Sequence, residues 1–192
     1  ERVNPRAVRK GDLRSSVNYV RNSIKVVVDA YDGTPNFYVV DDADPIAKSY
    51  QRQFPNLFSE ETPSTELTEH FRYPEDLFRM QTEMWGRYRI TEASEFYDAA
   101  GAWSVAQDPG NSIGQTAVES VIDASGNIIS SSEVRIAPQY LLMRLPGDED
   151  ESFVIFRPFV PFSDDDSRKN LEGFMVVHND PERYGEIEVY EI

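Results

Sequence analysis

The sequence of residues 70–90 is His-Phe-Arg-Tyr-Pro-Glu-Asp-Leu-Phe-Arg-Met-Gln-Thr-Glu-Met-Trp-Gly-Arg-Tyr-Arg-Ile, and it predicts the best-defined helix of the chain. Pro74 suits the first turn of a helix, and Glu75 and Asp76 complement the positive end of its dipole. Gly86 weakens the helix near its end. Apolar side chains recur at helical spacing, so we expect them to form the face that packs into the core. These residues are Leu77, Met80, Met84 and Tyr88, with Phe78 and Trp85 widening the face.

Two runs of β-branched and aromatic residues before this helix predict a β-hairpin. Residues 24–30 and 36–40 are separated by Tyr-Asp-Gly-Thr-Pro, in which Asp-Gly is a favoured turn dipeptide. Asp44 then precedes Pro45, a pair that suits the N-cap and the first position of a helix. We expect this helix to end before Pro55.

The last third of the chain again predicts strands joined by short turns. Residues 140–145 and 153–159 flank the acidic loop 146–151, and residues 174–178 and 187–192 form a second expected pair. Most connections between strands are too short for the crossovers that parallel strands need. The sequence therefore predicts an α+β fold, mostly an antiparallel sheet built from hairpins at both ends of the chain, with a central group of helices.

The length and composition indicate one soluble domain over residues 1–192. Residues 107–132 are rich in Gly, Ser, Asn and Pro, and we expect a mobile loop there, with a weak hairpin around residues 125–127. The chain holds no run of about 18 apolar residues that could span a membrane. It begins at Glu1 without a methionine and ends directly after a strand pattern, so we interpret it as a part of a longer protein.

Charge and cysteine content exclude several classes of function. The chain carries 34 acidic and 19 basic residues, which gives a net charge of −15. Such a surface repels nucleic acid and anionic lipid headgroups, and we expect neither as a direct partner. The chain contains no cysteine, which excludes disulfides, thiolate metal sites and cysteine nucleophiles.

No catalytic residue is predicted from the sequence. The two histidines, His70 and His178, lack the His-Glu-x-x-His spacing of a zinc protease, and a structural role suits both. The Gly-x-Ser-x-Gly motif of serine hydrolases is absent. Residues 110–114 contain two glycines but lack the Gly-Lys-Ser/Thr ending of a phosphate-binding loop. The sequence therefore favours a protein that is not an enzyme.

Clustered carboxylates are the candidate cation ligands. We single out Asp164, Asp165 and Asp166 as a candidate site for a divalent cation, because hard cations bind several converging oxygen atoms. The acidic stretches 41–44 and 148–151 are further candidates. None of these clusters has the spacing of an EF-hand, and a solvated loop is the alternative at each. We expect no other cofactor.

The start of the central helix is the candidate binding surface. Arg72, Tyr73, Glu75 and Asp76 crowd polar groups around one helix N-terminus. Such a cluster could bind a ligand at the surface. Alternatively it serves packing, in which case we expect it to be buried against residues 31–34.

A set of distinctive segments runs through nearly the whole chain. They are residues 19–34, 37–40, 44–45, 54–55, 70–79 with Gln81, 140–143, 145–147, 184–185 and 189–191. In this order they resemble a bacterial family of large multi-pass membrane proteins, uncharacterised protein family 0182.

The resemblance implies a location but no catalytic residues. In that family a group of transmembrane helices is followed by a large soluble extracytoplasmic region, to which this chain would belong. The expected location is the cell membrane, with this domain on its extracytoplasmic side and contact with the membrane only through the parent protein. The expected partners are the rest of its own membrane protein, with other envelope proteins or a second copy as further candidates. The expected function is non-catalytic recognition or assembly, and the alternative is a cell-envelope hydrolase or a divalent-cation-dependent enzyme domain.

Overall fold

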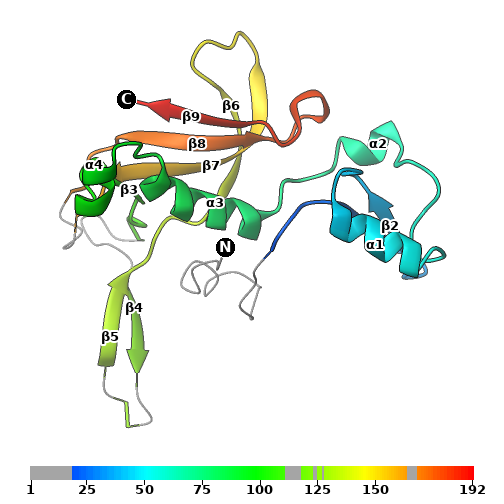
Figure 1. The fold of residues 1–192 in the computed structure, drawn as a ribbon, viewed down its shortest axis with the longest axis horizontal. Coiled ribbons are helices and arrows are strands. Elements are labelled where there is room, and N and C mark those ends of the chain that lie inside the picture. Colours follow the sequence, from blue (N-terminus) through cyan, green and yellow to red (C-terminus); the bar gives the residue numbers. More distant parts are fainter. Residues whose placement is uncertain (1–18, 111–117, 123–124, 127, 164–167) are drawn as a thin grey trace.

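A computed structural model describes residues 19–110, 118–122, 125–126, 128–163 and 168–192 (Figure 1). A five-stranded antiparallel sheet forms its centre, and the long helix α3 (Glu75–Tyr88) packs against it. Two further antiparallel strand pairs lie outside this sheet. The predicted α+β fold, with antiparallel sheets and a central group of helices, is confirmed.

Residues 19–59 form what we call the N-terminal unit, which lies to one side of the central sheet in Figure 1. β1 (Ile24–Val28) pairs with β2 (Pro35–Val39), and Gly33 in the turn between them has a φ of 78°, which favours glycine. α1 (Pro45–Gln53) begins after Asp44, whose carboxylate accepts a hydrogen bond from the backbone N–H of Ile46 at 2.8 Å. The predicted hairpin and the predicted helix start are both confirmed.

Three helices follow this unit. α2 (Thr65–Thr68) is a single turn capped by Ser64, and α4 (Ala93–Asp98) follows α3. The predicted acidic residues lie in the first turn of α3, but Pro74 is its N-cap rather than its first helical residue. No helix in the described ranges is long and apolar enough to cross a membrane.

β7 (Glu151–Pro161) is the longest strand and organises the central sheet. β8 (Gly173–His178) pairs along one side of it, and β9 (Ile187–Glu191) pairs with β8. On the other side of β7, β6 (Gln139–Arg144) pairs with its first half and β3 (Trp103–Val105) with its second half. The acidic loop predicted in this region connects β6 to β7.

β4 (Val118–Ile122) and β5 (Ile128–Glu133) form a separate hairpin that extends away from the central sheet in Figure 1. It is the weak hairpin predicted around residues 125–127. Residues 111–117, 123–124 and 127 of the predicted mobile loop lie outside the described residues, so the mobility of this loop stays a prediction.

The buried face of α3 differs from the predicted one. The helix buries Phe78, Arg79, Met80, Thr82 and Gly86. Three residues predicted in the core are exposed instead, Met84 by 38%, Trp85 by 39% and Tyr88 by 61%. The cause is a close approach to β3, since a Cβ atom on Gly86 would lie 2.3 Å from the backbone oxygen of Trp103. Small and polar side chains permit this approach, so the buried face is rotated away from Met84, Trp85 and Tyr88 while Phe78 and Met80 stay buried as predicted.

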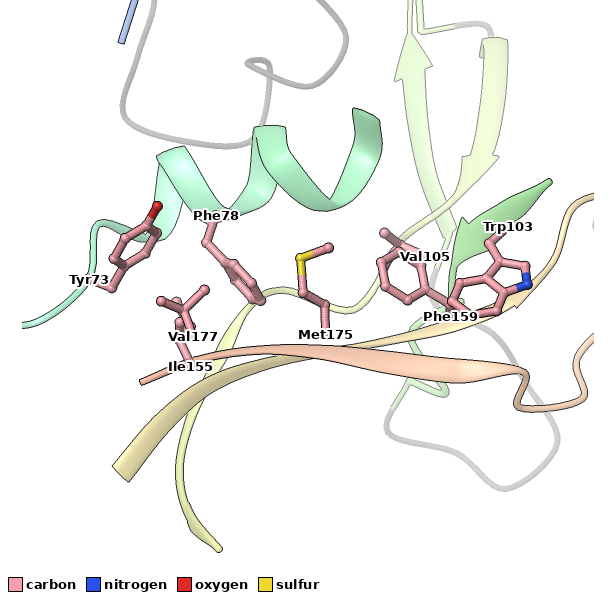
Figure 2. Packing of buried hydrophobic residues seen from close by; sticks show 8 residues of the cluster. All are labelled: Tyr73, Phe78, Trp103, Val105, Ile155, Phe159, Met175 and Val177. Carbon is pink, nitrogen blue, oxygen red and sulfur yellow. The ribbon is translucent and has the colours of Figure 1, made fainter. Parts of the chain in front are cut away.

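The main core lies between α3 and one face of β7 and β8 (Figure 2). Phe78 extends from the helix toward Ile155, Met175 and Val177 of the sheet, and none of the four is more than 2% exposed. Burying each such side chain contributes about 1.5–3 kcal/mol. A smaller cluster on the opposite face of the sheet contains Leu145, Val154 and Val176.

A buried arginine ties α3 to the sheet. Arg157 of β7 is 2% exposed, and it donates to the Thr82 hydroxyl at 2.7 Å and to the Arg79 carbonyl at 3.3 Å, both on α3. Its Nε donates to the Ile136 carbonyl at 2.8 Å, and the Glu83 carboxylate lies 3.3 Å from its guanidinium. Burial lowers the pKa of Arg157 to about 10 and Glu83 opposes this shift, so the side chain is charged at neutral pH.

We expect the Arg157→Met variant to lose about 2–4 kcal/mol of unfolding free energy, because two buried acceptors and one partly buried acceptor lose their donor. The unfolding free energy of Arg157→Lys should lie between those of Arg157→Met and the wild type, because a lysine keeps the charge but cannot donate to all three acceptors in the planar geometry of a guanidinium group. Glu83→Gln is the matched control and should cost less than about 1 kcal/mol, because the Glu83 side chain is 38% exposed. Denaturant titration of the three variants measures these differences. An Arg157→Met variant as stable as the wild type would contradict the role given to Arg157.

Candidate functional site

Residues 70–76 connect α2 to α3 and lie where the N-terminal unit, α3 and the central sheet meet. The predicted binding residues Arg72, Tyr73, Glu75 and Asp76 all belong to this junction or to the first turn of α3. The structure shows which other parts of the chain their polar groups contact.

Tyr73 is a core residue that fastens the junction to the sheet. It is 6% exposed, and its backbone N–H donates to Oδ1 of Asn179, just after β8, at 2.6 Å. Its carbonyl accepts from the Tyr140 hydroxyl of β6 at 2.6 Å, and its own hydroxyl donates to Gln81 of α3 at 3.0 Å. Burial raises the pKa of Tyr73, so its hydroxyl acts as a neutral donor at ordinary pH.

Arg72 joins the N-terminal unit to the sheet. Its carbonyl accepts from Nζ of Lys25 in β1 at 2.8 Å and from the Tyr184 hydroxyl at 3.0 Å. Its guanidinium lies over the rings of Phe153 and Tyr140, 4.7 and 5.5 Å from their centroids. Such cation–π contacts contribute about 0.5–1 kcal/mol each at exposed sites. Although Arg72 is exposed, its side chain lies against aromatic rings of the sheet.

Glu75 and Asp76 neutralise a buried arginine one turn further along α3. Nη2 of Arg79 lies 2.5 Å from Glu75, and its Nε lies 3.8 Å from Asp76. Arg79 is 7% exposed, so the two carboxylates offset the cost of removing its charge from water.

The junction therefore holds three parts of the chain together through the contacts that Arg72 and Tyr73 make within the described residues. These contacts favour the packing interpretation of its sequence pattern. Residues 31–34 do not pack against the junction, because Tyr31 is fully exposed at the tip of the β1–β2 hairpin. The hairpin contacts the junction near the start of β1, at Lys25, which is the end of the strand far from the tip.

The two histidines lie apart and have different environments. His70 is exposed at the end of α2, with Nδ1 2.7 Å from the Glu66 carbonyl. His178 is fully buried, and its ring nitrogens lie 3.9 Å from Asp180 and 3.7 Å from Glu188. Neither nitrogen of His178 has a hydrogen-bond partner within the described part of the chain. These positions fit the structural roles that the sequence predicted.

An open cavity of about 680 Å³ lies beside the loop between β6 and β7. The acidic residues that line it are Glu69, Asp148, Glu149, Asp150, Glu151, Asp180 and Glu182. Arg183 also lines it and pairs with Asp148 at 3.3 Å. In the described ranges no three His, Asp or Glu side chains are grouped closely enough to hold a metal ion. The predicted cation ligands Asp164, Asp165 and Asp166 lie outside these ranges.

Sequence reasoning missed two residues that hold the junction in place. Asn179 is 1% exposed and accepts the Tyr73 N–H, but in the sequence it looks like an ordinary turn residue before Asp-Pro. Lys25 lies in a β-branched strand, where a single lysine usually marks the solvent face. In the structure its ammonium group lies over the rings of Tyr184 and Phe71, at 5.1 and 5.7 Å from their centroids.

The half-buried Lys25 gives the junction a measurable pH dependence. Burial lowers the pKa of Lys25 from 10.5 to about 8, so the folded chain binds this proton less tightly than the unfolded chain. Stability is therefore lower when Lys25 is protonated and rises as the pH increases from about 8 toward 10.5. Burial raises the pKa of Tyr184 to about 12, which reduces stability only above the ordinary tyrosine range near pH 10.

We expect the wild type to gain stability relative to Lys25→Met between about pH 8 and pH 9.5, since the methionine variant lacks this proton. Denaturant midpoints of both proteins, measured at steps across that range, report the difference in slope. Two parallel profiles would show that Lys25 is not desolvated at the junction.

The chain is similar to regions of much longer proteins. The model of the uncharacterised protein family UPF0182 matches residues 4–192. A UPF0182 protein of Methanospirillum hungatei is 38% identical over 187 residues, which are 96% of this chain and 18% of that protein. Relatives in Trichodesmium erythraeum and Paenarthrobacter aurescens are 35% and 37% identical, and each match covers 93% of this chain and 17% of the relative.

No solved structure matches the chain. The chain spans about one sixth of the length of the curated relatives it matches. Because the family model covers nearly all of its residues, the chain belongs to the uncharacterised protein family UPF0182.

Proposed function

We propose that this chain is a non-catalytic recognition or assembly domain in the extracytoplasmic part of a multi-pass membrane protein. The junction at residues 70–76 carries the proposal. Its backbone and side-chain groups connect β1, α3, β6 and the turn after β8 through hydrogen bonds of 2.6–3.0 Å. A segment that is most distinctive in sequence is thus used to hold elements in place.

The arrangement suits a domain that presents a fixed surface. The arginine and the tyrosine of the junction contact residues far away in sequence, as Tyr73 and Asn179 do across 106 positions. Such long-range links fix the relative positions of the surrounding elements, which is what a recognition surface needs. Catalysis would instead need reactive groups that face a substrate.

The membrane part of the proposal comes from the family resemblance and from length. The matched relatives are about six times longer than the region they share with this chain. In the family that the sequence resembles, transmembrane helices precede a large extracytoplasmic region. The acidic, cysteine-free composition is compatible with that compartment.

Labelling from outside the cell tests the proposed location. We expect a Glu149→Cys variant of the full-length protein to react with a membrane-impermeant maleimide in intact cells, because Glu149 is exposed in the loop between β6 and β7. Mass spectrometry of the peptide identifies the label, since this region has no other cysteine. Val154→Cys is the matched control and should stay unlabelled, because Val154 is 0% exposed. Labelling at residue 149 only after lysis would contradict an extracytoplasmic location.

The competing function is a divalent-cation-dependent enzyme, and the acidic cavity is the feature that favours it. A cation that binds the folded state raises the melting temperature. Under the proposed function we expect the same melting temperature in millimolar calcium as in sodium chloride of equal ionic strength. A calcium-dependent rise that disappears in an Asp150→Asn variant would instead support the cation-dependent function.

A further inference from the structure

The N-terminal unit buries almost none of its apolar side chains within the described chain. In residues 19–59 the buried residues are Ser23, Asp44 and Ala47, and only the alanine is apolar. The Asp44 carboxylate accepts from the Ser23 hydroxyl at 2.5 Å and from the Tyr19 hydroxyl at 3.0 Å. The buried centre of this unit is therefore a hydrogen-bonded carboxylate, and its apolar residues other than Ala47 are partly or largely exposed.

One face of the β1–β2 pair is entirely apolar. Residues that pair across antiparallel strands point to the same face of the sheet. On this face Ile24 pairs with Val39, Val26 with Phe37 and Val28 with Pro35. Val26 and Val28 are 50% and 59% exposed, whereas Phe37 is half-buried and contacts the ring of Phe58, so the described residues cover only part of this face.

α1 carries a second apolar surface. Ile46, Tyr50 and Phe54 follow one another at a spacing of four residues along one side of the helix, and they are 49%, 51% and 46% exposed. The rings of Tyr50 and Phe54 stack with centroids 6.3 Å apart. A helix side that faces water normally carries polar residues, so this row has the character of a packing surface without its partner.

Among the described residues, the outer edge of β1 has backbone groups that are free to pair with a further strand. The sheet that β1 forms with β2 contains two strands, so in the described chain no strand pairs with the outer edge of β1. Val40 donates to Ser23, and Asp29 donates to Thr34, so the residues of odd number in β1 face β2. The N–H and C=O groups of Val26 and its even-numbered neighbours then point outward. An extended segment could add there as a third strand.

The charge of the unit also differs from that of the whole chain. Residues 19–59 contain four basic and five acidic residues, a net charge of −1, whereas the chain as a whole carries −15. The centres of protein interfaces are depleted in charge and enriched in aromatic residues. The unit is therefore enriched in aromatic residues and close to neutral, whereas most of the net negative charge lies in the rest of the chain.

We propose that the outer edge of β1, the apolar face of the hairpin and the Ile46–Tyr50–Phe54 row together bind an apolar segment of the same polypeptide that lies outside these 192 residues. This inference rests on the proposed function, because it requires the chain to be part of a larger protein. The matched relatives have about five sixths of their length outside the shared region, which supplies such a segment. A segment of the same polypeptide is present at an effective concentration of about millimolar, so even a modest apolar surface is occupied.

Two other occupants fit the observations less well. A second copy would bring a further charge of −15 close to the first, and this repulsion opposes self-association. A helix that lies on a membrane surface usually has a polar face rich in lysine and arginine. α1 has only Lys48 and Arg52, and the unit is slightly acidic.

Site-specific photo-crosslinking in the full-length protein tests the proposal. p-Benzoylphenylalanine replaces Val26 in one sample and Tyr50 in another, and digestion with mass spectrometry identifies the residues that react. The matched control carries the same group in place of Tyr97 on α4, an aromatic residue that is 85% exposed. We expect residues 26 and 50 to react with the same polypeptide outside the 192 residues, and we expect no such product at residue 97. Adding Tyr50→Asp to the Val26 sample should abolish its product.

The possible products separate failure of this inference from failure of the proposed function. Products with a second copy or with another protein would overturn the intramolecular partner and leave an assembly role standing. Products with lipid would contradict the proposed intramolecular partner, and they would also contradict the expectation that this domain has no direct contact with the membrane. If residues 26, 50 and 97 all give no cross-linked product, both the inference and the assembly function are wrong.

Discussion

The position of α3 on the central sheet depends on Arg157. Its guanidinium enters the core from β7, the strand with the most neighbours in the sheet, and it donates to the hydroxyl of Thr82 and the carbonyl of Arg79. A charged group that is 2% exposed needs these partners, because an unpaired buried charge is far more costly than the pairing is favourable. This requirement selects one rotation of the helix about its axis. Apolar packing alone would accept several rotations, since hydrophobic burial has no direction.

The rotation that Arg157 selects determines what happens at both ends of α3. At the C-terminal end it turns Gly86 toward the backbone of Trp103, a contact that no larger residue permits. At the N-terminal end it places Tyr73 where its N–H meets Asn179 and its carbonyl meets Tyr140. The preceding residue, Arg72, then offers its carbonyl to Lys25 of β1. The N-terminal unit is thus attached to the sheet through a series of contacts that begins with the hydrogen bonds of the buried Arg157.

Much of the fold was predictable from the sequence because local signals act over a few residues. The Asp-Gly turn, the Asp44 N-cap and the strand pairs β6–β7 and β8–β9 near the C-terminus were all found in this way. The face of α3 was predicted only in part: Phe78 and Met80 are buried as expected, but periodicity records only apolar residues, and the buried side also includes Thr82, Arg79 and Gly86. The junction was located correctly, but its partners were not, because Lys25 and Asn179 are 47 and 106 positions away from the residues they contact. Contacts over such separations leave no pattern in a single sequence.

The N-terminal unit depends for its stability on contacts with other parts of the protein. A unit of about 40 residues rarely folds on its own without a staple, because it buries too little surface to offset chain entropy. This unit has no cysteine, and Ala47 is the only apolar residue it buries among the described residues. Its order must therefore come from its attachments, of which Lys25 and the Asn22–Tyr184 hydrogen bond at 2.8 Å are the polar ones. Hydrogen bonds at Lys25 do not restrain the other side of the hairpin, where Val26 and Val28 are exposed, and the row on α1 is exposed as well. A second contact on that side would supply the missing apolar burial, and it would make the folding of this unit depend on the larger protein around it.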